Sequence, residues 1–454
     1  MITNRKELIR SGTCIKVRKL ALGSLEAALL AADPKRSVKE HVMLNDNALQ
    51  IKNRQYPFTF DHVYVIGAGK ASGYMAEALS EVLSDKITTG LVIIPDNFKV
   101  KLRTGNINLW RGTHPIPSDK GVKGTKKILS IVKNATAKDL VICLFSGGGS
   151  ALMPLPFKGI TISQKKKITN DLLRSGATIA EINAVRKHIS ALKGGRLAES
   201  VSKSTLASLI ISDVVGDKLD TIASGPTVPD STTFANASEV LKKYSLWNSL
   251  DRSIKSVIED GLLGSIPETP KPGSKVFKSV GNFIIGSNEL ACKAALGYLE
   301  SKGVRSTLLT TLMQGEAREV GVVASSIAQQ INSRSARLAT PTSVIMGGET
   351  TVTVKGNGRG GRNQELVLSA LRSIGSLKNT AIASIGTDGI DGNSDAAGAI
   401  ADTATSGRAR QKKMLPTEYL VNNDSNTFFK KLNDVIKTGP TGTNVNDVVV
   451  VVCA

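Results

Sequence analysis

The stretch PTSVIMGGETTVTVKGNGRGGRNQELVLSAL (Pro341–Leu371) combines a strand pattern, a glycine-rich turn and the start of a helix. Ser343–Met346 is an apolar run ended by two glycines, and Thr351–Val354 alternates hydroxyl and valine side chains, which predicts a second, half-exposed strand. Lys355–Gly361 carries four glycines, and Glu365 marks a helix start. Two interpretations stay open from this stretch alone: a backbone site for phosphate, and a basic loop that contacts only water.

The length and the composition indicate a globular protein of two domains. A chain of 454 residues exceeds one ordinary hydrophobic core, and no apolar run is long enough to span a membrane. Leu20–Ala32 is the segment nearest to a signal peptide, but it contains Glu26 and has the apolar spacing of an amphipathic helix. We therefore expect a structural first helix, a cytoplasmic location and no membrane attachment.

The cysteines and the charge exclude some classes of function. The four cysteines are scattered without CxxC spacing, and there are only four histidines, so the sequence predicts neither a disulfide framework nor a zinc centre. The net charge is +21, but the lysines and arginines are spread along the whole chain and aromatic residues make up only 4%. A non-catalytic nucleic-acid binder is therefore a weak alternative. A positive field for acidic metabolites or nucleotides fits equally well, and a solvated surface of no specific role fits best.

A strand followed by a glycine turn and a helix first occurs at Val63–Ile66. The turn contains Gly67, Gly69 and Lys70, and the following segment has one apolar helix face. Such βα units place ligands at the carboxyl end of a sheet. Ser72 replaces the third glycine of a dinucleotide fingerprint, so that signal is weak. Lys70 is more informative, because an ammonium at such a turn can hold a phosphate or a carboxylate.

A second glycine turn follows the most strand-like segment of the first half, Leu140–Phe145. It consists of five small residues, Ser146, Gly147, Gly148, Gly149 and Ser150. Three consecutive glycines at a strand end form a cradle of backbone N–H donors for phosphate. The alternative, a tight bend, rarely requires three glycines, so we favour a ligand site.

Basic and acidic residues follow other predicted elements. Lys193–Arg196 reads KGGR, another basic glycine turn, and Asp213 follows the predicted strand Leu206–Ile211. Asp388 and Asp391 belong to a group of three aspartates after another strand, and such a group converges on a cation or on substrate hydroxyls more readily than a plain turn does.

Ser224–Thr233 is rich in proline and hydroxyl residues and has no apolar period, which is typical of a linker. We therefore expect domains at residues 1–232 and 233–454. The alternative that the last strand, Asp447–Cys453, returns to the first domain stays open.

Together these motifs resemble the glycerate 2-kinase family, whose C-terminal half is called the MOFRL domain. The matching segments lie in family order along nearly the whole chain: VIGAGKAS (65–72), FSGGGSALMPLP (145–156), KGGRLA (193–198), ISDVVGD (211–217), GGETTVTVKGNGRGGRNQE (347–365), GTDGIDGNSDAAGA (386–399) and TGPTGTNVND (438–447). One departure is Ser118, where the family usually has an acidic residue.

The resemblance implies a fold of two α/β domains, the first Rossmann-like, with the active site in the cleft between them. It implies transfer of a phosphoryl group from ATP, with Mg²⁺, to the 2-hydroxyl of D-glycerate, giving 2-phosphoglycerate and ADP. The partners are then glycerate and a nucleotide, without nucleic acid or membrane, and a homodimer is compatible with the sequence.

The resemblance also implies roles for individual residues. Lys70 and Arg362 handle charge at the cleft, and the glycine loops hold the nucleotide through Gly67, Gly69, Ser146–Ser150 and Lys193. Asp213, Glu349, Asp388 and Asp391 are unranked candidates for holding Mg²⁺ or orienting the attacking hydroxyl. We assign Asp213 to catalysis, Asp388 and Asp391 to the metal, and Arg359, Asn363 and Glu349 to the substrate.

The rival enzyme is an NAD(P)-dependent hydroxypyruvate reductase. It requires a complete glycine fingerprint, which Ser72 interrupts, and an acid for the ribose after the next strand, for which Asp96 is available.

Overall fold

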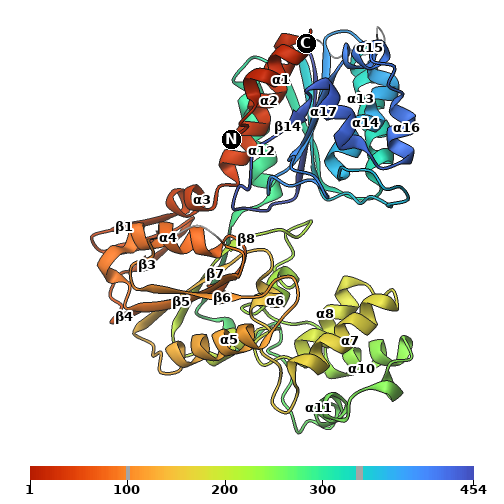
Figure 1. The fold of residues 1–454 in the computed structure, drawn as a ribbon. Coiled ribbons are helices and arrows are strands. Elements are labelled where there is room, and N and C mark those ends of the chain that lie inside the picture. The colour runs from red at the N-terminus through yellow and green to blue at the C-terminus, as the bar shows by residue number, and fades with distance from the viewer. Residues whose placement is uncertain (99–102, 334–340) are drawn as a thin grey trace. The chain divides into compact units, whose positions relative to one another are not determined.

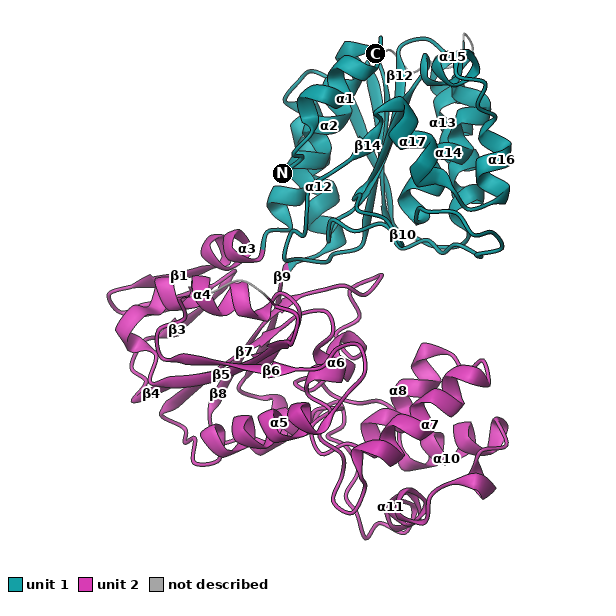
Figure 2. Ribbon diagram, in the orientation of Figure 1, with its two compact units in different colours: residues 1–33, 286–454 teal, residues 34–285 magenta. Residues whose placement is uncertain are grey.

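The computed structural model describes residues 1–98, 103–333 and 341–454, and it divides into two compact units. Unit 1 combines residues 1–33 with 286–454, and unit 2 comprises residues 34–285 (Figure 2). The expected boundary at residue 232 falls inside unit 2. The N-terminal segment, and not the last strand, is the part that belongs with the other half of the chain.

The proline- and hydroxyl-rich stretch at 224–233 resembles a linker only in composition. Asp230 within it is fully buried, and its carboxylate accepts hydrogen bonds from Lys187 Nζ at 3.2 Å and Thr269 Oγ1 at 3.0 Å. The Asp230 side chain therefore forms hydrogen bonds inside unit 2, and the polar composition of this stretch does not indicate a domain boundary.

Unit 2 contains a sheet to which six strands of the described chain contribute, in the order β6-β5-β4-β7-β8-β9 (Figure 1). These strands are β4 (His62–Ala68), β5 (Thr89–Pro95), β6 (Ile107–Gly112), β7 (Asp139–Phe145), β8 (Thr205–Ile211) and β9 (Val280–Gly286), the last leading into unit 1. A small antiparallel sheet consists of β1 (Val42–Asn45), β2 (Ala48–Ile51) and β3 (Arg54–Pro57).

The neighbours from β6 to β8 are parallel, and their order is that of doubly wound α/β sheets. In such sheets ligands bind where the strand order reverses, which here is between the carboxyl ends of β4 and β7. All seven residues of β7 are buried, as expected for a strand that is covered on both faces.

The helices of unit 2 cover this sheet and form a separate helical part (Figure 2). They are α3 (Pro34–His41), α4 (Ser72–Leu83), α5 (Asp119–Val132), α6 (Gly149–Leu152), α7 (Ile162–Arg174), α8 (Ile179–His188), α9 (Arg196–Ser200), α10 (Phe234–Lys243) and α11 (Arg252–Leu262). Helices α7, α8, α10 and α11 share a core around Phe234. Capping boxes at Thr161 and Thr178 define where α7 and α8 begin.

Unit 1 has a mixed sheet whose described strands have the order β10-β11-β15-β12-β13-β14. They are β10 (Arg305–Met313), β11 (Thr342–Gly348), β12 (Thr380–Gly386), β13 (Gly398–Asp402), β14 (Val435–Ile436) and β15 (Asp447–Cys453). Its helices are α1 (Arg5–Ser11), α2 (Ile15–Ala31), α12 (Asn288–Glu300), α13 (Ala317–Asn332), α14 (Arg362–Ile374), α15 (Thr405–Gln411), α16 (Pro416–Val421) and α17 (Ser425–Leu432). No helix in the described part of the chain is long and apolar enough to cross a membrane.

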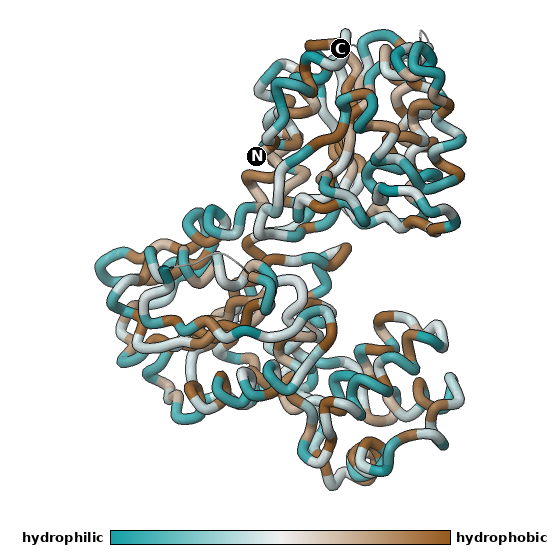
Figure 3. The backbone as a smooth tube through the Cα atoms, viewed as in Figure 1, coloured by the Kyte–Doolittle hydropathy of each residue, from teal (hydrophilic) through white to brown (hydrophobic). Residues whose placement is uncertain are grey.

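The last strand, β15, lies in the middle of this sheet, antiparallel to both β11 and β12. Its register pairs Asp447 with Gly348 on one side and Gly386 on the other. Because β15 runs opposite to its neighbours, its first residue lies at the edge where β11 and β12 end. Figure 3 shows hydrophobic residues along the central strands and mixed colouring along the helices.

The second strand expected from the opening stretch, Thr351–Val354, is wrong. Thr351 forms only an isolated bridge with Glu316. The hydroxyl of Thr353 bonds the Glu316 carboxylate at 2.5 Å, so side-chain contacts hold this segment in place of a ladder of backbone hydrogen bonds.

A buried arginine attaches helix α2 to the C-terminal part of unit 1. Arg18 is fully buried, with Nε 2.6 Å from Asp402 Oδ2 and Nη1 2.8 Å from Asp434 Oδ1. Both carboxylates are themselves fully buried. Breaking a buried ion pair on one side leaves uncompensated charge, which is far costlier than losing a surface pair.

We expect Arg18→Met to lower the free energy of unfolding of unit 1 by about 3–5 kcal/mol, because Asp402 loses its buried partner. Chemical denaturation followed by circular dichroism measures this loss. Lys293→Met, which removes the exposed Lys293–Glu289 pair of α12, is the control and should cost at most about 0.5 kcal/mol. Equal losses in the two variants would contradict the assignment.

Candidate functional site

The two glycine turns of unit 2 meet at the carboxyl ends of β4 and β7. Gly148 has φ +83°, and a Cβ on it would lie 2.7 Å from His114 Cδ2 and 3.4 Å from Lys70 Cγ. A Cβ on Gly147 would lie 2.2 Å from Asp213 Oδ2. The positive φ of Gly148 favours glycine, and a Cβ at Gly147 would displace the Asp213 carboxylate. The structure thus brings Lys70, His114 and Asp213 against one loop.

Hydrogen bonds join the two turns directly. Lys70 N donates to Gly147 O at 2.8 Å, and Ala71 N donates to Ser146 Oγ at 2.9 Å. Ser146 is 2% exposed, and its hydroxyl is also 3.1 Å from Ser72 Oγ. The hydroxyl of Ser146 therefore holds the two turns together.

His114 lies against the glycine turn, and the sequence pattern did not single it out. It follows strand β6 and begins the segment HPIP. Burial, together with the charge of Lys70, lowers the pKa of His114 to about 4. The imidazole is consequently neutral near pH 7 and available as a hydrogen-bond donor or acceptor.

Ser150 and Lys193 lie together, as expected. Lys193 Nζ is 2.5 Å from Ser150 Oγ and 3.2 Å from Ser150 O. Arg186, from α8, donates from Nη2 to the same hydroxyl oxygen at 2.6 Å. Arg186 is half-buried beside the glycine loop, although nothing in the local sequence distinguishes it from a surface arginine.

The glycine loop of unit 1 matches neither interpretation of the opening stretch. Its backbone N–H groups are held by the side chains of neighbouring segments. Asn423 Oδ1 accepts from Lys355 N at 2.8 Å and Gly356 N at 3.0 Å, and Asp424 Oδ1 accepts from Arg359 N at 2.9 Å. These amides are not presented to an anion, and the loop is packed against the 422–424 turn.

Asp391 caps helix α14, which follows this glycine loop. Its carboxylate accepts from the backbone N–H and the side-chain amide of both Asn363 and Gln364, at 2.9–3.3 Å. A carboxylate has about four lone-pair positions, and these four bonds occupy them. The contacts thus argue against Asp391 as a metal ligand and explain how α14 begins at Arg362.

Two carboxylates fix the guanidinium of Arg362. Its Nη1 is 2.7 Å from Glu349 Oε1, its Nη2 is 3.0 Å from Asp447 Oδ1, and its Nε is 2.6 Å from Asp447 Oδ2. Such a paired approach to one carboxylate sets the plane of the arginine fork. Arg362 remains partly exposed, with 29% of its side chain accessible.

Asp447 is a second residue that the sequence reasoning did not assign, although it ends the motif TGPTGTNVND and precedes five valines. It is 1% exposed, and Asn363 Nδ2 donates to Oδ1 at 3.0 Å. Asn363 Oδ1 in turn accepts from Ser384 Oγ at 2.5 Å, so Asn363 positions Asp447 and has no open face for substrate. Burial raises the pKa of Asp447 to about 6, with Arg362 opposing the shift.

A pocket of about 600 Å³ in unit 1 opens beside this network. It is lined by Thr350, Thr351, Val352, Val354, Gly358, Gly360, Gly361, Arg362, Glu365, Asp388, Ile390, Asp391, Gly392, Asn393 and Asn423. Of the residues expected in the site, Arg362, Asp388 and Asp391 line it, whereas Arg359 is exposed and outside it. The described residues contain no group of three or more His, Cys, Asp or Glu side chains suited to a metal ion.

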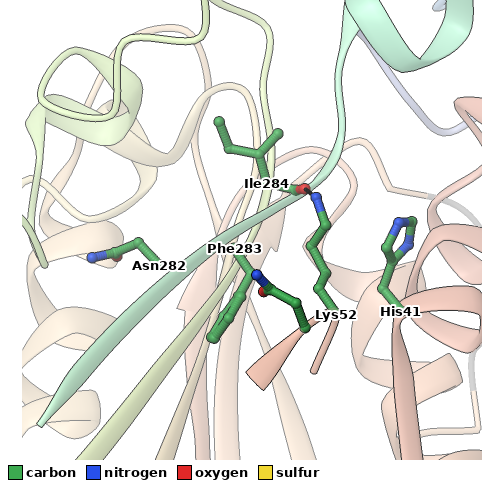
Figure 4. Close-up of a pocket in the computed structure, with 6 residues that line it drawn as sticks. His41, Lys52, Asn282, Phe283 and Ile284 are labelled. Carbon is green, nitrogen blue, oxygen red and sulfur yellow. Dashed lines mark hydrogen bonds between the residues drawn. The ribbon is translucent and has the colours of Figure 1, made fainter. Parts of the chain in front are cut away.

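Figure 4 shows another pocket, of about 630 Å³, in unit 2. It is lined by His41, Lys52, Asn53, Asn282, Phe283 and Ile284. Lys52 Nζ donates to Ile284 O at 2.9 Å across it. None of the residues that the sequence singled out lines this pocket, and we assign no role to it.

The neutral state of His114 is testable by NMR. We expect its imidazole signals, assigned with His114→Gln, to stay constant from pH 8 to 5.5 and to shift only toward pH 4. Because the folded-state pKa lies below the ordinary 6.5, this group's contribution to stability is present above pH 6.5 and is lost on acidification through pH 4. Lys70→Met should raise the pKa, since it removes a nearby cation. Titration near pH 6.5 in the unchanged protein would contradict this environment.

Comparisons with known proteins cover almost the whole chain. A domain of unknown function, DUF4147, matches residues 20–259, and the MOFRL family matches residues 342–447. The glycerate 2-kinase of Pyrococcus horikoshii is 41% identical over 96% of this chain and 97% of its own length. An Agrobacterium vitis relative with the provisional name hydroxypyruvate reductase is 40% identical over 85% of this chain and 97% of its own.

The fold agrees with these similarities. A crystal structure of glycerate kinase from Thermotoga maritima matches with a TM-score of 0.86 at 38% identity, over 96% of this chain and 99% of that one. The glycine turns of unit 2, the Arg362 network of unit 1 and a similarity that extends over nearly the full length make this chain a member of the glycerate 2-kinase family with a C-terminal MOFRL domain.

Proposed function

We propose that this protein transfers the terminal phosphoryl group of ATP to the 2-hydroxyl of D-glycerate, giving 2-phosphoglycerate and ADP. Family membership supports the reaction. One observation links this reaction to particular residues. Asp447 and Glu349 fix the guanidinium of Arg362 beside a pocket of about 600 Å³.

Phosphoryl transfer depends on positioning and on stabilising negative charge more than on covalent chemistry. Hydrogen bonds with the described residues use one N–H group on Nη1 and one on Nη2 of Arg362, while Nε approaches Asp447 Oδ2 as an ion pair. The second N–H group on each of Nη1 and Nη2 can bind an anionic oxygen of the substrate, which gives Arg362 its proposed role. Asp447 and Asn363 are positioning residues in this scheme, because they reach the substrate only through Arg362.

The glycine turns of unit 2 are the proposed site of the nucleotide phosphates. The strand order reverses there, Lys70 supplies a point charge, and Lys193 and Ser150 lie at the end of the second turn. Gly67, Gly69 and Gly147–Gly149 allow the backbone to approach closely. Asp213, packed against Gly147, is the proposed partner for the attacking hydroxyl or for the metal.

The residues fit Mg²⁺ in the form in which phosphate oxygens and water supply most of its ligands. Asp388 is the proposed protein ligand, since it is partly exposed and lines the pocket of Arg362, whereas the oxygens of Asp391 are occupied by the α14 cap. When bound, Mg²⁺ would neutralise charge on the phosphates. Glu349 stays a candidate for orienting the substrate through Arg362.

A cytoplasmic location is part of the proposal, because ATP and sugar acids are metabolites of that compartment. The proposed partners are glycerate and the nucleotide. The cleft between the domains and a homodimer stay predictions.

We expect Lys70→Ala and Arg362→Ala each to lower kcat by at least about a hundredfold, because each removes a cation that stabilises the transferred phosphoryl group. A coupled assay of ADP release with D-glycerate measures this. Arg372→Ala, an exposed arginine on the same helix as Arg362, is the matched control and should keep near-normal activity. Near-normal rates for both test variants would exclude the assignment.

The hydroxypyruvate reductase activity that one relative's name carries is tested separately. We expect no oxidation of NADH or NADPH with hydroxypyruvate, because Ser72 interrupts the glycine fingerprint and its hydroxyl is bonded to Leu144 O at 3.0 Å. Absorbance at the nicotinamide band measures the outcome. Steady oxidation that depends on hydroxypyruvate would favour the reductase.

A further inference from the structure

Three cations from separate segments of unit 2 meet around Ser150, and we call Lys165, Arg186 and Lys193 the cation cluster. Arg186 Nη2 and Lys193 Nζ both donate to Ser150 Oγ, at 2.6 and 2.5 Å. Lys165, on α7, donates to Pro154 O at 3.1 Å, four residues after Ser150. Lys165 and Lys193 are only 5% and 1% exposed.

The cation cluster has no carboxylate partner among the described residues. Its hydrogen-bond partners are neutral oxygens, those of Ser150, Pro154, Ala223 and Ser224. Burying charge is costly unless an opposite charge accompanies it. Three cations packed together without one therefore form an unbalanced site.

Lys187, next to Arg186 in the sequence, is a buried lysine of the same region that has carboxylate partners. Lys187 is 2% exposed, and its Nζ lies 3.2 Å from Asp230 and 3.5 Å from Asp220. A buried lysine whose role is to stabilise the fold is thus neutralised by protein carboxylates here. The absence of such carboxylates at the cation cluster, within the described chain, indicates that its counter-charge comes from a ligand.

The position of the cation cluster indicates how a ligand reaches it. Ser150 and Arg186 are half-buried, while the two lysines lie behind them. Ser150 directly follows the glycine turn after β7, at the point where the strand order reverses. Ser150 and Arg186 are therefore the more accessible members of the site, and the two lysines are the more buried ones.

We infer that the cation cluster, with the hydroxyl of Ser150, is a binding site for a phosphoryl group. Three cationic donors match the double charge and the several oxygens of a phosphoryl group better than the single charge of a carboxylate. The identity of the ligand that carries the phosphoryl group, a nucleotide or the phosphorylated product, rests on the proposed function. The charge argument itself is independent of any reaction.

Protonation of the lysines responds to such a ligand. Burial, and then the charges of Arg186 and Lys165, lower the pKa of Lys193, and burial and Arg186 lower that of Lys165. A bound phosphoryl group favours the charged ammonium forms. Binding must therefore weaken as rising pH removes these protons, in a range where an exposed lysine of pKa about 10.4 stays charged.

The test is isothermal titration of the full-length protein with ADP, 2-phosphoglycerate and inorganic pyrophosphate. We expect Lys165→Met and Lys193→Met to weaken binding of at least one probe by about tenfold to a hundredfold, as for lost hydrogen bonds to a charged group. Lys166→Met is the matched control, adjacent to Lys165 but outside the cluster, and should bind as the unchanged protein does. Loss for ADP alone identifies the nucleotide as the source, and loss for 2-phosphoglycerate alone identifies the product.

A second measurement on the unchanged protein covers the case in which the lysine variants do not fold. Between neutral pH and the ordinary lysine pKa of about 10.4 we expect affinity for the probes to fall, because burial lowers the pKa of Lys165 and of Lys193. Wild-type binding of all probes by both variants, no binding by the unchanged protein, or constant affinity across this range would overturn the inference. Because titration needs no turnover, failure of the proposed kinase reaction in the ADP-release assay is distinguished from failure of this site.

Discussion

The site of unit 1 depends on the direction of one strand. Strand β15 runs antiparallel between β11 and β12, so that its first residue, Asp447, faces the ends of both neighbours. That register brings the Asp447 carboxylate to Arg362, which begins α14, and to the edge from which Glu349 and Asp388 emerge. In a wholly parallel sheet the first residue of this strand would lie at the opposite edge, and Arg362 would lose the partner that sets its orientation.

The glycine-rich segments have different physical roles despite similar sequences. In unit 2, the glycines at 147 and 148 make room for Asp213, His114 and Lys70, so they bring three polar side chains together. In unit 1, the amides of the 355–361 loop are bonded to Asn423 and its neighbours, so that loop shapes one wall of a pocket. Glycine turns with basic residues thus need not bind anions through their backbone.

The roles of individual lysines in this basic chain depend on their surroundings in the fold. A net charge of +21 spread along the sequence says little about any single lysine. Two buried lysines differ in their partners. Lys187 is paired with two aspartates, whereas Lys193 contacts only neutral oxygens among the described residues. Cost of desolvation, not sequence spacing, distinguishes a lysine that stabilises the fold from one that awaits a ligand.

Local pattern determined much of what the sequence predicted correctly. Apolar runs such as Leu140–Phe145 and the last strand needed only hydrophobicity and turn residues to be recognised as strands. The linker at 224–233 and the strand at Thr351–Val354 failed because hydroxyl-rich and alternating segments also suit packed loops, where side chains supply the hydrogen bonds.

The sequence by itself determined the α/β class, the order of the elements along the chain and the places of the glycine turns, because these depend on residues close together in the chain. Only the tertiary structure decided that residues 1–33 belong with the C-terminal half, that Asp391 caps a helix, that Asp447 contacts Arg362, and that His114 lies against the glycine turn of unit 2. These features depend on strand direction, register and burial. They join groups that are tens to hundreds of residues apart, and no local pattern specifies such contacts.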